Sequence, residues 1–404
     1  MTWPIFLILF YGFTLSGVYS LGKLVAVGWV GAWLAFGGVK RIGLPVLYLA
    51  VLTLTTITSA DPWVSIWHLW GTNTCGLLAA LVLVPFWACV GPGERGGIEN
   101  GLRVGGLLMA VIGLLQLVPI PWLTPFPLFT GNRVYSTLGS PIYLGAVAVL
   151  CFPFMRSKIE QGLIVAVLLA SGSRGAWIAT ALGWAYLNWD NLSPRVRTWG
   201  SILGLAGITG AFWYRPLSDL GRVVTWGAAL DGFMTRPWFG WGAGNFYTVA
   251  AVFRTPAWDE AYGNTTQDHA HNLFLEAAST SGVLGLLGIS VLLFSLWKNS
   301  DRIARSSLLG VFVVGMLNPL PMVAKALCLA LAASSKVEEI NFRKTTPLLV
   351  KGVSAISFLA VAWLIHLDRM MTFYGDVPWG FYSAKAAYYT GLIKEKIERR
   401  QFKL

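Results

Sequence analysis

Two of the four histidines in the chain, His269 and His271, stand directly before a long apolar run. The stretch reads QDHAHNLFLEAASTSGVLG over residues 267–285. A neutral imidazole can accept a proton from a hydroxyl group near pH 7, which makes His271 a candidate general base at the end of a hydrophobic segment. Histidines near the ends of such segments also serve packing, and the pattern by itself leaves both interpretations open.

The basic residues expected on the same side of the membrane as His271 are all arginines. They are Arg133, Arg174, Arg215, Arg222, Arg236 and Arg254. Outer loops of membrane proteins normally avoid positive charge, whereas guanidinium groups bind phosphate in a bidentate manner. A histidine beside such arginines predicts group transfer from a phosphorylated donor. Arg174 lies in SGSRGAW, a very short turn between two apolar runs, where a snorkelling side chain is the alternative.

A metal site is the competing interpretation of the histidine stretch, through Asp268, His269 and His271. Ligands two residues apart do not share a helix face, and no other cluster of histidine, cysteine or acidic residues accompanies them in the sequence. We therefore expect no metal and no other cofactor, and interpret His269 as a substrate-binding or supporting residue. The further candidates for substrate binding are Arg133, Arg236 and Asn272.

These residues belong to an unusually apolar chain. Of its 404 residues 55% are hydrophobic and 12% are charged, whereas a soluble domain carries about 25% charged residues. Apolar runs of about 15 to 20 residues recur along the chain, so we predict an all-α, polytopic integral membrane bundle of about 12 or 13 spans. The candidate spans are 3–20, 22–38, 43–59, 73–90, 102–120, 138–155, 160–172, 174–188, 199–214, 272–297, 306–318, 320–334 and 347–366.

Lysine and arginine are concentrated in alternate loops, which the positive-inside rule assigns to the cytoplasm. The segment 215–270 then lies outside, and its length favours a functional role. It is expected to contain short helices, one of them ending near Met234, and a tight turn at GWGAGN. Residues 1–366 form one transmembrane domain in this prediction, and 367–404 a short basic amphipathic tail. The net charge of +12 is spread over many loops, which disfavours nucleic-acid binding.

Four stretches together resemble the O-antigen ligase and O-antigen polymerase superfamily, whose relatives include pilin O-oligosaccharyltransferases. They are SRGAW at 173–177, GRVVTWGAAL at 221–230, RPWFGWGAGNF at 236–246 and HAHNLFLEAASTSGVLG at 269–285. The most specific part is the ligase-type pattern: histidine, then Asn, Ser or Gln, nine residues, glycine, two residues, and Gly, Thr or Tyr. It is met in full by His271-Asn272, Gly282 and Gly285. The resemblance covers roughly 130–300.

The resemblance implies a membrane-embedded, GT-C-type glycosyltransferase of the bacterial inner membrane with its active site facing the periplasm. The donor would be a glycan on undecaprenyl pyrophosphate. The acceptor would be a sugar hydroxyl of lipid A core for a ligase, or a second lipid-linked glycan for a polymerase. The family's functional histidine falls on His271 and its two functional arginines on Arg174 and Arg222. The family reaction is similar to an inverting transfer that needs no metal.

Joined to the chemistry of the residues, the resemblance suggests that His271 deprotonates or orients the acceptor hydroxyl while Arg174 and Arg222 neutralise the leaving pyrophosphate. A ligase is favoured over a polymerase because the histidine pattern fits the ligase form closely. Transport of an anion or another solute is a third possibility, since many spans and buried arginines also suit a carrier. It is disfavoured because the sequence shows no inverted repeat and its chemistry gathers on one side of the membrane.

Overall fold

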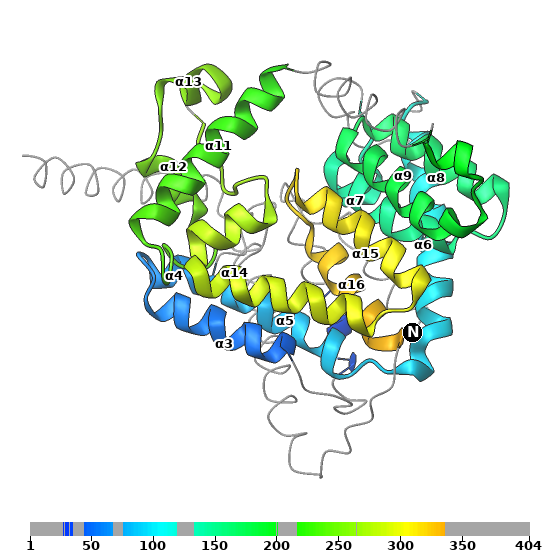
Figure 1. Cartoon of the computed structure of the whole chain (residues 1–404), viewed down its shortest axis with the longest axis horizontal. Helices are drawn as coiled ribbons and strands as arrows, with labels where there is room; N and C mark the ends of the chain where they lie inside the picture. Colours follow the sequence, from blue (N-terminus) through cyan, green and yellow to red (C-terminus); the bar gives the residue numbers. More distant parts are fainter. Residues whose placement is uncertain are drawn as a thin grey trace, which may run out of the picture.

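The computed structural model describes residues 44–67, 76–118, 133–198, 216–263 and 265–335, with a few residues between 27 and 34 and Gly200. The described chain folds into helices and contains no β-strand, in agreement with the all-α prediction (Figure 1). The predicted spans 3–20 and 347–366 and the tail 367–404 lie outside the described residues, as do 199–214 apart from Gly200 and most of 22–38.

Each predicted span that falls within the described residues corresponds to an α-helix. These helices are α3 (Leu44–Ile57), α5 (Leu77–Ala88), α6 (Arg95–Leu115), α7 (Pro141–Cys151), α8 (Lys158–Ser171), α9 (Arg174–Asn188), α14 (Leu273–Asn299), α15 (Arg302–Gly315) and α16 (Met322–Ser335). Two helical segments of the described chain are long and apolar enough to cross a membrane, Pro92–Leu115 and Leu273–Asn299. A bundle of 12 or 13 spans stays a prediction.

Helix α6 begins earlier than the predicted span 102–120 because its first turns carry charges that are paired, and it ends at Leu115. Arg95 Nε lies 2.7 Å from Glu99 Oε1 on the same helix, and Arg103 forms an ion pair with Glu160 at the start of α8. Because of these charged residues, the predicted span began only at residue 102. Pairing within and between helices lets them remain helical, with the apolar part of α6 following.

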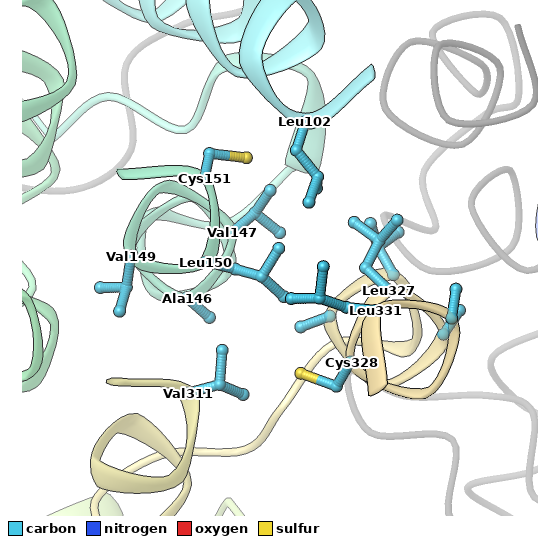
Figure 2. Close-up of a cluster of buried hydrophobic side chains, with 14 of the residues drawn as sticks. Leu102, Ala146, Val147, Val149, Leu150, Cys151, Val311, Leu327, Cys328 and Leu331 are labelled. Carbon is cyan, nitrogen blue, oxygen red and sulfur yellow. The ribbon is translucent and has the colours of Figure 1, made fainter. Parts of the chain in front are cut away.

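Helix α7 forms the centre of the main core. It is buried all round and apolar on every face, which is typical of a helix enclosed by others. Figure 2 shows Leu150 of α7 directed toward α16, with Leu102 of α6 and Val311 of α15 lining the other sides of the cluster. Side-chain hydroxyls add hydrogen bonds between helices, since Ser307 Oγ of α15 donates to Leu150 O at 2.9 Å. Small residues of this kind allow helix backbones to approach closely.

The segment 215–270 folds over the N-terminal half of α14 (Figure 1). It contains α11 (Pro216–Thr235), α12 (Phe246–Val252) and α13 (Pro256–Tyr262), and α11 ends one residue beyond the predicted Met234. A second, smaller core holds these helices together, built around the fully buried Trp258. Trp258 Nε1 donates to Thr265 O at 3.0 Å, which ties α13 to the chain that leads to the histidines.

Candidate active site

His271 lies in a strained turn directly before α14. Its φ is +55°, in the left-handed region that non-glycine residues rarely adopt, and a residue held there costs of order 1–3 kcal/mol. Both neighbours are tied to α14. The Ala270 N–H donates to Glu276 Oε2 at 2.6 Å, and Asn272 Oδ1 caps the helix by accepting two N–H groups of its first turn at 3.0 and 3.1 Å.

The two imidazoles of this turn face one another. The ring centroids of His269 and His271 are 4.3 Å apart, and His269 Nδ1 binds the carboxylate of Asp268. Within the described chain, neither His269 Nε2 nor His271 Nδ1 has a hydrogen-bond partner, and both atoms are buried. Burial lowers the pKa of His271 well below 6.5, with His269 and Arg222 adding to the effect and Asp268 opposing it. His271 is thus neutral near pH 7 and able to accept a proton.

Arg222 of α11 reaches the turn that follows α15. Its Nε donates to Leu317 O at 3.1 Å, and its Nη2 lies 3.4 Å from Asn318 Oδ1. The side chain of Asn272, next to His271, donates to Met316 O of the same turn at 3.1 Å. Residues 316–318, here called the 316–318 turn, therefore join Arg222 to the helix cap beside His271.

The N-terminus of α9, which begins at Arg174, meets the same turn from another side. Gly175 packs on Asn318 so closely that a Cβ there would lie 3.0 Å from Asn318 Nδ2. The Asn318 side chain is buried, with 4% of the residue exposed. The structure thus brings α9, α11 and the cap of α14 together at the 316–318 turn, and with them the sequence positions of Arg174, Arg222 and His271.

Arg133 covers the turn between α8 and α9. Its Nε donates to Ser171 O at 2.7 Å. Gly172, with φ of +59°, leaves room for this side chain, since a Cβ would lie 3.1 Å from Arg133 Nε. Arg133 is thereby held at the end of α8, close in sequence to the start of α9 at Arg174. A direct role in substrate binding stays a prediction.

Arg236 follows α11, and its contacts lie in the glycine-rich turn. Its guanidinium carbon stands 4.6 Å from the ring centroid of Trp241, a cation–π arrangement at an exposed position. The side chain of Arg236 packs on this turn, whereas the side chain of Arg222 forms hydrogen bonds with the 316–318 turn. Substrate binding by Arg236 also stays a prediction.

The first glycine of the histidine pattern, Gly282, has a structural explanation in α14. Gly282 interrupts the helix with φ of +64° and ψ of −158°, and a Cβ there would overlap the backbone of Trp238. The turn 237–242 docks at this kink through backbone hydrogen bonds, including Val283 N to Pro237 O at 2.7 Å and Gly242 N to Thr280 O at 2.7 Å. The RPWFGWGAGNF stretch and the histidine helix therefore form one interlocked unit.

An apolar cavity of about 490 Å³ runs beside the N-terminal turns of α14. Helices α3, α5, α15 and α16 form its other walls, and its charged lining residues within the described chain are Glu276 and Lys325. On α14 the lining residues extend from Leu273, two residues after His271, to Trp297. The cavity is thus an apolar space that starts next to the candidate site.

Sequence reasoning missed Asn318 and Tyr262. Asn318 precedes a proline at the end of the predicted span 306–318. Tyr262 ends α13, and its hydroxyl lies against Gly221, where a Cβ would be 2.6 Å away. Burial raises the pKa of Tyr262, and Arg222 and a hydrogen bond with Thr225 oppose that rise. In the sequence, the available signal for Asn318 was a polar residue among apolar neighbours.

A neutral histidine and two arginine-bearing helices gathered at one turn are suited to group transfer from an anionic donor. Residues 162–290 of the chain match the family model described as O-antigen ligase. The matched segment contains Arg174, Arg222 and His271, and it confirms the resemblance drawn from the motifs. Over these residues the chain is similar to the O-antigen ligase superfamily. No curated protein matches it.

Proposed function

We propose that this protein is an O-antigen ligase-type glycosyltransferase. It moves a glycan from undecaprenyl pyrophosphate onto a sugar hydroxyl of lipid A core, on the periplasmic side of the bacterial inner membrane. The observation that carries the proposal is the meeting of three elements at the 316–318 turn: Arg222, the Asn272 cap beside His271, and the N-terminus of α9. All three elements lie within the segment that matches the O-antigen ligase family.

The chemistry follows from the protonation states of these groups. Neutral His271 takes the proton of the acceptor hydroxyl as its oxygen attacks the anomeric carbon of the donor sugar. The bond from that carbon to the pyrophosphate oxygen breaks, and undecaprenyl pyrophosphate leaves with the bonding electrons. Arg222 and Arg174 stabilise the negative charge that develops on the leaving group. Attack from the face opposite the pyrophosphate inverts the anomeric configuration.

The apolar cavity supports a lipid-linked donor. It begins at Leu273, next to the cap that adjoins His271, and its wall is formed by apolar side chains of several helices. A prenyl chain lying along this space would leave its pyrophosphate at the end of α14, where the arginines approach. A soluble sugar nucleotide has no apolar chain to occupy such a space.

A polymerase that joins lipid-linked repeat units is the second candidate, because the matched family includes both activities. The decisive experiment supplies purified protein with a prenyl-pyrophosphate glycan, with and without lipid A core, and identifies the products by mass. A ligase produces glycosylated core only when core is present. Growth of the lipid-linked glycan in the absence of core would identify a polymerase, and no covalent product with either acceptor would contradict the proposal.

A further inference from the structure

Glu276 is a buried carboxylate that the proposed reaction does not use. It lies in the first turn of α14 with 9% of its surface exposed, on the wall of the apolar cavity. A carboxylate is expensive in such surroundings, and ionisable residues in apolar helices usually have a function. Its Oε2 accepts the N–H of Ala270 at 2.6 Å, so the side chain reaches back past the helix cap to the histidine turn.

The hydrogen bond from Ala270 to Glu276 holds one side of the strained backbone at His271. His271 has φ of +55°, and it stands between two residues that are each tied to α14. Asn272 is fixed on one side by its own cap, and Ala270 is fixed on the other by Glu276. Ala270 is fully buried, so water cannot replace the acceptor of its N–H. Without Glu276 only one end of the left-handed turn would be held.

We propose that Glu276 is a positioning residue, whose carboxylate holds the Ala270 N–H and thereby fixes the left-handed turn that presents the His271 imidazole to the acceptor. The inference rests on the proposed function, in which His271 takes the acceptor proton. Glu276 acts through the backbone and touches no reacting atom. What the turn requires is a hydrogen-bond acceptor at the right reach, and not a negative charge.

A charge role is the competing interpretation, because Lys325 of α16 lines the same cavity. Two substitutions separate the alternatives. Glu276→Gln keeps the length and an acceptor oxygen but removes the charge. Glu276→Asp keeps the charge but shortens the side chain by one methylene, which withdraws the oxygen from Ala270. Positioning predicts that the glutamine variant works and the aspartate variant fails, whereas charge pairing predicts the reverse.

The test measures kcat, the KM for the lipid-linked donor, and hydrogen exchange of a peptide covering residues 268–272, in full-length protein. We expect Glu276→Gln to keep kcat within about threefold of the wild-type value. We expect Glu276→Asp to lose about 100-fold in kcat, the scale of a small misplacement of a reacting group. Its donor KM should change by less than about threefold, and its 268–272 peptide should exchange faster. Ser279→Ala is the matched control, since this buried hydroxyl bonds only to the carbonyls of its own helix among the described residues.

Failure of this inference is distinguishable from failure of the proposed function. Equal kcat in Glu276→Asp and Ser279→Ala, with His271→Ala inactive, would overturn the role of Glu276 and leave the proposed base in place. An inactive glutamine variant beside an active aspartate variant would overturn it in favour of charge. Full transfer by His271→Ala would instead overturn the proposed base itself.

Discussion

Arg222 and Asn272 hold consecutive carbonyl groups of one turn. Arg222 Nε donates to Leu317 O and Asn272 Nδ2 donates to Met316 O, each at 3.1 Å. One side chain comes from α11 and the other from the cap of α14, and they meet on the end of α15. A movement of this turn would therefore shift the candidate arginine and the candidate histidine together.

Loss of the Asn318 side chain should impair transfer. Asn318→Ala removes the amide oxygen near Arg222 Nη2 and opens a space beside Gly175. An unsatisfied or misplaced buried group costs about 1–3 kcal/mol, so we expect a rate that is about 10- to 100-fold lower at saturating donor. Initial rates of glycan transfer measure this. Asn188→Ala, at the other end of α9, is the control, and an equal rate in both variants would exclude a role for Asn318.

The pH dependence of transfer should reflect the lowered pKa of His271. Because burial, His269 and Arg222 lower that pKa well below 6.5, the imidazole stays neutral as the pH falls to 6.5. The rate should therefore be level from about pH 8 to 6.5 and decline only at lower pH, where His271 becomes protonated. A decline centred at or above pH 6.5 would contradict this assignment.

Asp268 should influence the pH at which the rate declines on the acidic side, here called the acidic limb. Its carboxylate raises the pKa of His271 against the other influences. Removing the charge in Asp268→Asn should therefore lower the pKa further and move the acidic limb to lower pH. The maximal rate can also change, because the carboxylate binds His269, so the midpoint of the limb is the quantity to compare. A shift toward higher pH would show that the electrostatic account has the wrong sign.

Gly282→Ala should destabilise the fold and Gly227→Ala should not. At Gly282 the φ of +64° and the contact with the Trp238 backbone both exclude a Cβ, and such strain costs of order 1–3 kcal/mol. Gly227 is helical with open space around it, so alanine there should be neutral or stabilise by about 0.5–1 kcal/mol. Thermal unfolding in detergent compares the two. Equal Tm values would show that the docking of residues 237–242 at the kink does not depend on glycine.

Chelation should leave the reaction unchanged. In the proposed mechanism the pyrophosphate charge is neutralised by guanidinium groups, so transfer should proceed at the same rate with EDTA as with added Mg²⁺. Rates measured after dialysis against chelator test this. A requirement for a divalent cation would mean that the arginines alone do not stabilise the leaving group.

The sequence predicts local features well and the assembly of the site poorly. Helix positions follow from apolar runs, and the histidine pattern and GWGAGN turn follow from residue types that have few alternatives. The bond from Glu276 to Ala270 is short in sequence, but it depends on a left-handed His271, which no composition rule predicts. Asn318 was missed because its partners, Gly175 and Arg222, come from distant parts of the chain and meet it only in three dimensions.

The central claim is that neutral His271 takes the acceptor proton. The most direct test is single-turnover transfer to lipid A core by His271→Ala, compared with wild type and with Arg302→Ala, an exposed arginine at the far end of α15. The account predicts a loss of about 10²- to 10⁴-fold in the rate of transfer for His271→Ala, with donor binding and Tm retained and with Arg302→Ala unchanged. Transfer by His271→Ala at the wild-type rate would contradict the account.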